Sequence, residues 1–219
     1  MKFIEIEMDQ WARKEHYNHY TNNVNCTYSV TVQIDITSLL PLLREKGLKS
    51  YPVQIYMLST IVNQLPEFRM DINDKGNVGY WEKVNPMYTT LNPSTNTFSA
   101  LWTNYDVNFG QFYDLFLKET TQYANCDRIL FPQSAVPANV FNISSLPWVD
   151  FTAFNINVLP NKNYLFPIFT IGKYIQENGK TLMPLAIQCH HAACDGWHVG
   201  KFVELLRELA MTPNRWLQI

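Results

Sequence analysis

Seven consecutive residues near the C-terminus combine two possible bases, one thiol and one acid. They are His190, His191, Ala192, Ala193, Cys194, Asp195 and Gly196. A neutral imidazole titrates near physiological pH, so a histidine in a cleft is the commonest general base in proteins. Because an apolar, strand-like run precedes this segment, side-chain alternation predicts that His190 and His191 point to opposite faces. At most one of them is then expected in a given site.

Three other interpretations of this segment stay open from the residues alone. Adjacent histidines are often structural, and Asp195 is of a residue type that commonly caps a helix. A zinc site is a second interpretation, although structural zinc sites usually draw their ligands from two separated pairs. The six crowded candidate ligands are Cys189, His190, His191, Cys194, Asp195 and His198. A cysteine nucleophile is a third, but nothing in the sequence marks either thiol as a low-pKa group.

Two elements must position this segment. Residues 181–189 are mostly apolar and predict a buried strand that runs into the histidines. From Gly196 onward, Val199, Phe202, Val203, Leu206 and Leu209 share one face of an amphipathic helix. A strand-to-helix junction exposes side chains while the strand holds the backbone rigid, so it is a suitable place for a catalytic residue.

Strands and helices alternate along the rest of the chain. Strands are expected at 26–36, 88–91, 97–101, 152–159 and 168–176, and helices at 9–20, 39–47, 53–65 and 108–123. Asp9 is a candidate N-cap, Gly47 a helix stop, and residues 128–147 a long loop with three prolines. Turns are expected at 74–77 and at Asn178-Gly179. This pattern predicts an α/β fold with a mixed sheet, in a single domain over residues 1–219.

The charge content narrows the classes of partner. The chain has 219 residues, 17 basic and 19 acidic side chains and a net charge of -2, and only 16% of its residues are charged. An average soluble domain has about 25%. Nucleic acid is not expected as a partner, because phosphate binding needs concentrated positive charge. With 14% aromatic residues, either much of the surface is polar and neutral or some is buried against partner subunits.

No targeting segment or membrane span is expected. Acidic residues Glu5 and Glu7 interrupt the N-terminal segment, which has no apolar run typical of a signal peptide. No stretch approaches the ~18 apolar residues of a transmembrane helix. The four cysteines include no CxxC pair, which favours free thiols. These observations predict a cytoplasmic protein.

The segment His190 to Gly196 matches the HHxxxDG motif of the CoA-dependent acyltransferases. Further motifs follow one another along nearly the whole chain: Trp11-Ala12-Arg13-Lys14-Glu15-His16-Tyr17, Cys26-Thr27-Tyr28, Tyr51-Pro52, Pro66-Glu67-Phe68-Arg69, Thr97-Phe98-Ser99, Leu146-Pro147-Trp148 and Phe169-Thr170-Ile171-Gly172-Lys173-Tyr174. Together they resemble the chloramphenicol acetyltransferase family of the classical type.

The resemblance implies a two-layer sandwich of a mixed β-sheet with helices, the CoA-dependent acyltransferase fold. It also implies a homotrimer with sites between subunits, His191 coming from one face and most antibiotic-pocket residues from the other. The reaction implied is transfer of an acetyl group from acetyl-CoA, as co-substrate, to the primary (C3) hydroxyl of chloramphenicol. No tightly bound cofactor and no metal are expected.

The resemblance also implies residue roles. His191 is the general base and Ser144, rather than its neighbour Ser145, the oxyanion donor. Asp195 pairs with Arg13 to hold the loop, and loss of either is expected to cost ~3 kcal/mol or more. Substrate contacts match Tyr20, Cys26, Phe98, Phe131, Ile156 and Thr170. Residues that match the CoA tunnel and its phosphate sites are Tyr51, Trp148, Tyr174, Lys49 and Lys173.

Four residues depart from the pattern of the family. Cys189 replaces an aliphatic residue, Trp197 a phenylalanine, Asn96 a glutamate and His19 a frequent aromatic. The last two bear on substrate affinity rather than on the reaction. Alternatives are an acyltransferase for another alcohol, a dihydrolipoyl transferase core, which usually follows further domains and linkers, and a catalytically silent trimer, which has no need of the full catalytic set.

Overall fold

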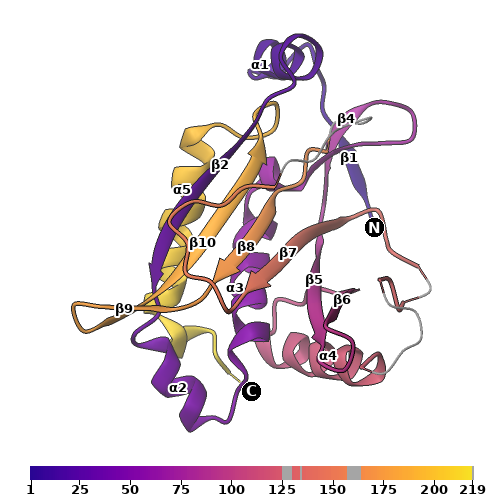
Figure 1. Cartoon of the computed structure of the whole chain (residues 1–219). Coiled ribbons are helices and arrows are strands. Elements are labelled where there is room, and N and C mark those ends of the chain that lie inside the picture. The colour runs from indigo at the N-terminus through magenta and orange to yellow at the C-terminus, as the bar shows by residue number, and fades with distance from the viewer. Residues whose placement is uncertain (125–129, 134, 157–163, 219) are drawn as a thin grey trace.

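The computed structural model describes residues 1–124, 130–133, 135–156 and 164–218. A seven-stranded mixed sheet is the centre of the fold (Figure 1). Its strands, in spatial order, are β2 (Thr27–Asp35), β10 (Lys180–His190), β8 (Ile168–Gly172), β7 (Val140–Leu146), β5 (Asn85–Asn92) and β6 (Thr97–Trp102), with β9 (Ile175–Glu177) also paired to β10. Strand β7 is parallel to both neighbours, and the other pairs are antiparallel. The expected mixed sheet is confirmed.

Helices pack on one face of this sheet (Figure 1). They are α3 (Ser50–Gln64), α4 (Phe109–Gln122) and α5 (Gly196–Met211), whereas α2 (Leu39–Glu45) lies beyond the end of β2 (Figure 1). Helix α3 contacts α4, α5 and β5, and its residues 52–59 are all buried. Its apolar character all round follows from that position, because a helix enclosed by other elements has no solvent face. No helix of the described ranges is both long and apolar enough to cross a membrane.

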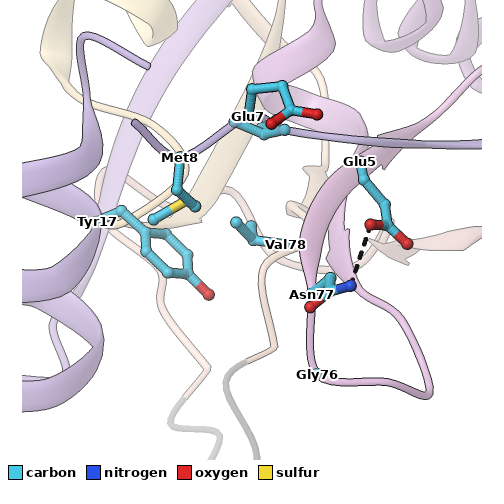
Figure 2. A pocket seen from close by; sticks show the side chains of 8 residues that line it. Glu5, Glu7, Met8, Tyr17, Gly76, Asn77 and Val78 are labelled. Atoms are coloured by element: carbon cyan, nitrogen blue, oxygen red, sulfur yellow. Dashed lines mark hydrogen bonds between the residues drawn. The ribbon is translucent and has the colours of Figure 1, made fainter. Parts of the chain in front are cut away.

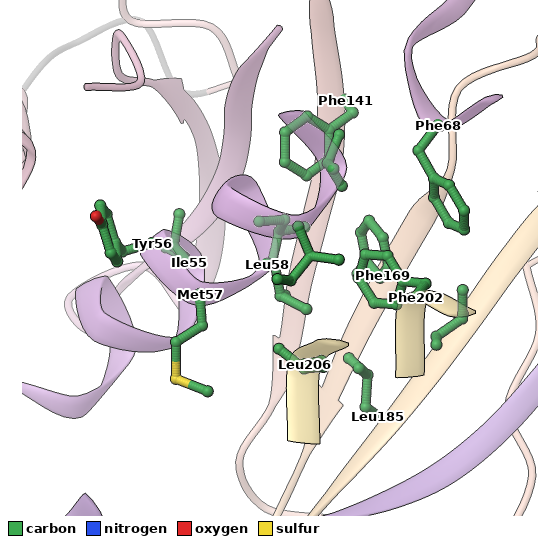
Figure 3. Close-up of a cluster of buried hydrophobic side chains, with 14 of the residues drawn as sticks. Ile55, Tyr56, Met57, Leu58, Phe68, Phe141, Phe169, Leu185, Phe202 and Leu206 are labelled. Atoms are coloured by element: carbon green, nitrogen blue, oxygen red, sulfur yellow. The ribbon is translucent and has the colours of Figure 1, made fainter. Parts of the chain in front are cut away.

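The core lies between the sheet and these helices (Figure 3). The rings of Phe169 and Phe202 stack with centroids 5.1 Å apart, and Phe68 stacks on the other side of Phe202 at 4.8 Å. Each such side chain contributes on the order of 2–3 kcal/mol by its burial. Apolar side chains on strands therefore dictate which face of the sheet receives the helices.

The opposite face of the sheet carries mostly small and polar residues, and we call it the open face. Strand register places one row of side chains across it: Thr31, Ala186, Thr170, Ser144, Thr89 and Ala100. Their chain neighbours Ile143, Ile171 and Leu185 point into the core instead. Alternation with period two assigns each strand residue to one of these two faces.

A smaller antiparallel sheet and several short helices complete the described chain. The sheet consists of β1 (Phe3–Glu5), β4 (Val78–Trp81) and β3 (Met70–Ile72). The short helices are α1 (Lys14–Asn18), the π-helix η1 (His19–Asn23), and the 3₁₀-helices η2 (Pro66–Arg69) and η3 (Pro213–Arg215). The turn at 74–77 joins β3 and β4, as expected. Gly47, Asn178 and Gly179 have positive φ angles, which confirms the predicted helix stop and hairpin turn.

Two predictions of helix and loop were wrong. The helix predicted over 9–20 begins only at Lys14, and Asp9 binds the side chain of Lys14 instead of capping. This polar segment has few apolar side chains to bury, and helices gain most of their stability from such burial. Within the predicted loop 128–147, residues 140–146 form the central strand β7. The three prolines at 132, 137 and 147 lie outside that strand, and Val140, Phe141 and Ile143 are buried in it.

Two strand predictions also need correction. The expected strand 168–176 is divided into β8 and β9 at residues 173–174. In the expected strand 152–159, the described residues 152–156 have no strand pairing, and residues 157–159 lie outside the described chain. Residues 152–156 lie instead beside the open face, where Ile156 N donates to Gln188 Oε1 at 2.8 Å.

Candidate active site

His190 and His191 have different environments at the end of β10. His190 is buried, its Nδ1 accepts a hydrogen bond from Ala192 N at 3.1 Å, and its Nε2 lies 3.1 Å from Asn25 Oδ1. Burial, and the neighbouring His191, lower the pKa of His190. His190 is therefore suited to hold the turn as a neutral ring rather than to exchange protons.

His191 is partly exposed and held in one orientation by aromatic rings. Its ring stacks on Tyr20 with centroids 4.0 Å apart and planes 10° from parallel, and the ring of Tyr28 lies 5.1 Å away. Its main-chain N donates to Cys26 O at 2.8 Å. Its Nδ1 is buried and has no hydrogen-bond partner among the described residues. The exposed side of the ring is thus the side available to a substrate.

One arginine ties both ends of the 191–195 loop. Arg13 Nη1 donates to Asp195 Oδ2, and Arg13 Nη2 donates to His191 O at 3.3 Å. Burial alone would raise the pKa of Asp195, but the nearby His198 and Arg13 hold it below its ordinary value. The carboxylate therefore stays ionised and keeps its bond to Arg13 near neutral pH.

Asp195 is also the N-cap of α5, as one of the open interpretations stated. Its Oδ1 accepts a hydrogen bond from Trp197 N at 3.0 Å, and its own N donates to His198 Nδ1 at 3.1 Å. This pattern is a capping box with histidine in place of the usual Glu or Gln. The D-x-x-H spacing in the sequence is a signal for this capping box, which an interpretation of His198 as a metal ligand alone misses.

The zinc and thiolate interpretations gain no support. In the described part of the chain, no group of three or more His, Cys, Asp or Glu side chains is arranged to hold a metal ion. Cys194 is completely enclosed, and burial raises the pKa of its thiol. A nucleophilic cysteine needs the opposite shift.

Ser144 and Thr170 form a separate polar pair on the open face. Their side-chain oxygens are 2.9 Å apart, and Thr170 is only 2% exposed. Both residues belong to the row of the open face that also includes Ala186 of β10. His191 lies five residues beyond Ala186 along the chain. At about 3.3 Å per residue and about 4.8 Å per strand spacing, Ser144 and His191 of one chain are roughly 19 Å apart. No single small substrate can contact both within one chain.

The residues expected near CoA gather where α3 begins. Tyr174 Oη is hydrogen-bonded by Gln54 Nε2, and Lys173 N donates to Val149 O at 2.9 Å, next to the exposed Trp148. Tyr51 follows at the start of α3, with its hydroxyl donating to Thr89 O at 3.1 Å. Lys49 is the N-cap residue of the same helix. These five residues share one end of the sheet with Ser144, because β7 and β8 both end there.

Three residues expected in the substrate pocket are exposed apolar side chains. Phe98 on β6 is 53% exposed, Phe131 is 43% exposed, and Ile156 lies over Gln188. Phe98 is at the β6 edge of the sheet, far from the β2–β10 edge that carries His191 (Figure 1). Tyr20 and Cys26, in contrast, contact His191 within the same chain. The expected substrate residues thus divide between two parts of the surface.

Two hollows among the described residues are lined by neither His191 nor Ser144. One, of about 310 Å³, lies between the N-terminal segment and the β3–β4 turn, with Tyr17 and Met8 on one side and Asn77 bonded to Glu5 on the other (Figure 2). The other, of about 360 Å³, lies on the open face beside Gln188 and Ile156. The volume of these hollows therefore does not identify the active site, and the arrangement of the reactive side chains must do so.

Known chloramphenicol acetyltransferases match this chain over nearly its whole length. The family model of chloramphenicol acetyltransferase matches residues 1–207. A chloramphenicol acetyltransferase of Clostridium perfringens is 46% identical over 99% of both chains, and one of Bacillus pumilus is 50% identical over 95% of this chain and 94% of its own. The chain belongs to the chloramphenicol acetyltransferase family. It is accordingly an acyltransferase.

Solved structures show the same fold. A chloramphenicol acetyltransferase structure superposes with a TM-score of 0.85 at 20% identity, covering 95% of this chain and all of the other. The dihydrolipoamide acetyltransferase of Azotobacter vinelandii superposes with a TM-score of 0.68 at 18% identity, covering 93% and 88%. The fold of this chain is thus shared by a chloramphenicol acetyltransferase and a dihydrolipoamide acetyltransferase.

The departures from the family pattern lie in different surroundings. Cys189 is buried beneath the loop, and Trp197 is 74% exposed at the start of α5. Asn96 occupies the β5–β6 turn with a positive φ angle. His19 is exposed, with its ring 4.9 Å from Tyr20, which in turn stacks on His191. Of the four, His19 is connected most directly to the expected general base.

Proposed function

We propose that this protein transfers the acetyl group of acetyl-CoA to the primary (C3) hydroxyl of chloramphenicol and so confers resistance to the antibiotic. The observation that carries the proposal is a histidine held by Tyr20 and Arg13 in a chain whose close relatives are named chloramphenicol acetyltransferases. We further propose that residues 1–219 act as a single domain in the cytoplasm.

The proposed reaction is direct transfer in a ternary complex. His191 accepts the proton of the hydroxyl while the oxygen attacks the thioester carbonyl, since an alcohol is a poor nucleophile at neutral pH. Nδ1 is buried, which leaves Nε2 as the basic atom. The tetrahedral intermediate collapses by expelling the CoA thiolate, which takes the proton from His191. The loop contacts keep the ring aligned throughout, and alignment is a large part of the rate gain.

Ser144 is proposed to stabilise the oxyanion of that intermediate. Its hydroxyl can donate one hydrogen bond to the oxyanion while it accepts one from Thr170, an arrangement that the 2.9 Å contact supports. A donor that is already oriented costs no reorganisation during the reaction. Thr170 is thereby proposed to help bind the intermediate.

Assembly as a homotrimer is proposed to bring Ser144 of one subunit to His191 of the next. The roughly 19 Å between them within one chain supports a shared site. So does the exposure of several large apolar side chains around the open face, since such groups commonly mark an interface. They include Leu91, Phe98, Phe131, Trp148, Val149 and Ile156. Closed rotational symmetry then gives each subunit one complete site.

The two substrates are proposed to enter from different sides. Tyr20, Cys26, Phe98, Phe131 and Ile156 are proposed to line an apolar slot for the uncharged antibiotic. Acetyl-CoA, as a co-substrate and not a tightly bound cofactor, is proposed to lie along Tyr51, Trp148 and Tyr174. Lys49 and Lys173 are proposed to bind its phosphates, because ammonium groups pair favourably with phosphate oxygens.

Release of CoA thiol tests the proposed function. We expect thiol release from acetyl-CoA that depends on chloramphenicol and is absent with an analogue whose primary hydroxyl is replaced by fluorine. A flat signal with chloramphenicol would refute the proposal. Release with other alcohols in place of chloramphenicol would instead identify an acyltransferase for another acceptor.

A further inference from the structure

A second set of contacts holds Asp195 through its other carboxylate oxygen. Oδ1 of Asp195 lies 2.8 Å from His198 Nδ1, and Asp195 N donates to the same nitrogen at 3.1 Å. His198 therefore contacts both the side chain and the main chain of the residue that Arg13 binds. None of the roles proposed above involves it.

The far side of the His198 ring faces the 3₁₀-helix η2. His198 Nε2 is 3.8 Å from Glu67 Oε1, and the imidazole is only 10% exposed. Glu67 O also accepts a hydrogen bond from Cys194 Sγ at 3.5 Å, so η2 contacts the 191–195 loop a second time. The imidazole thus lies between two carboxylates, one on the loop and one on a separate element.

The imidazole of His198 can adopt two protonation states here, and in each state Nδ1 forms a hydrogen bond with Asp195. With its proton on Nε2, the neutral ring accepts the Asp195 N–H at Nδ1 and directs its own N–H toward Glu67. With a proton on Nδ1, it donates to Asp195 Oδ1 instead. One nitrogen cannot do both at once. In each state a buried ring of fixed orientation restrains the position of Asp195.

We propose that His198, oriented by Glu67, is a positioning residue for acyl transfer. Arg13 binds Asp195 and the carbonyl of His191 from one element, and the Glu67–His198 pair supports Asp195 from another. Movement of Asp195 would release Arg13 and with it the main chain of the general base. This inference rests on the proposed function.

Two substitutions separate positioning from simple helix capping. His198→Gln keeps a side chain that can complete a capping box, so the stability of α5 should be retained. Glu67→Gln removes only a charge and leaves its main-chain bond to Cys194. Glu204→Gln is the matched control, because Glu204 is an exposed carboxylate of α5 that pairs with Lys201 on the same helix. If His198 were merely a cap, all three variants would resemble the parent in turnover.

We expect kcat to fall about tenfold in His198→Gln and about threefold in Glu67→Gln, with both KM values within about twofold, because misalignment lowers turnover rather than binding. Turnover of both variants equal to that of Glu204→Gln would overturn the proposal. If His198→Gln does not fold, kcat of Glu67→Gln decides the matter alone.

Amide hydrogen exchange gives a readout that does not depend on the substrate. We expect the amides of residues 191–195 to exchange faster in His198→Gln and Glu67→Gln than in Glu204→Gln. Should the parent protein release no thiol with chloramphenicol, the proposed function fails, and unchanged exchange in both variants would separately overturn the role of His198.

Discussion

The 191–195 loop and the Ser144–Thr170 pair carry the two halves of one proposed reaction, but they differ in how firmly the surrounding chain holds them. The loop is bound by Arg13, His198, Tyr20 and the main chain of Cys26, all within one chain. The pair on the open face is joined by one side-chain hydrogen bond and is surrounded by exposed apolar residues. The proposed base is thus held in place within a single chain, whereas we propose that assembly completes the oxyanion site.

Substitution of the base should produce the largest effect. In His191→Ala, kcat should fall about 1,000-fold, because general-base catalysis contributes about 10²- to 10⁴-fold. His16→Ala, at an exposed histidine of α1, serves as the control and should leave turnover unchanged. Turnover of His191→Ala close to that of the control would exclude His191 as the base.

Removal of the oxyanion donor should have the next largest effect. Ser144→Ala is expected to lower kcat about 100-fold, as loss of one such donor typically does. Ser145→Ala is the control, because Ser145 is the next residue of β7 and points to the core side. It should change kcat by less than about twofold, as expected for a residue that is not coupled to the site. Equal losses in the two variants would mean that the open face does not supply the donor.

Mixing two inactive variants tests whether the halves come from different subunits. After His191→Ala and Ser144→Ala chains are unfolded and refolded together, about a quarter of the subunit contacts should pair an intact His191 with an intact Ser144. Activity should therefore recover to about a quarter of the parent value. No recovery in verified mixed trimers would place both residues in one chain's site.

Loss of the ion pair should affect stability more moderately. Asp195→Asn is expected to lower the free energy of unfolding by about 2 kcal/mol, less than for a fully buried pair, because the Asp195 side chain is 32% exposed. Thermal unfolding would show this as a melting temperature lower by about 6 °C. Lys14→Met, which removes the exposed ion pair with Asp9, should lower the melting temperature by much less.

Acid should produce the smallest difference. Because the pKa of Asp195 is lowered in the folded protein, its ionised form stabilises the fold above about pH 4, the pKa range of an unfolded aspartate. That contribution disappears as the pH falls through the folded-state pKa. The difference in melting temperature between the parent and Asp195→Asn should therefore become smaller from pH 7 to pH 3. A constant difference would contradict a stabilising role for ionised Asp195.

Strong periodic patterns predicted most of the fold. The apolar alternation of β10 and the spacing of Val199, Phe202 and Leu206 in α5 set the element types on both sides of the loop. Prediction failed where long-range pairing decided the outcome. The prolines that flank β7 favour a loop, and only its parallel partners β5 and β8 stabilise it as the middle of a sheet.

The same distinction holds for the site. The order of His191, Asp195 and the surrounding motifs along the chain was enough to indicate the family, because each motif is local. The Arg13–Asp195 bond was expected from the resemblance, and the structure confirms it across 182 positions of the chain. Neither the support of Asp195 by Glu67 nor the spatial separation of Ser144 from His191 could be read from spacing.

Composition alone determined that this chain has too few charges to cover a water-exposed surface of ordinary character. Local patterns indicated which residues are proposed to carry the chemistry. Tertiary structure decided where the uncharged surface lies, on the open face and around Phe98 and Phe131, and which polar groups meet. The physical reason is that strand register and side-chain alternation, which depend on partners far along the chain, assign each residue to the core or to the open face.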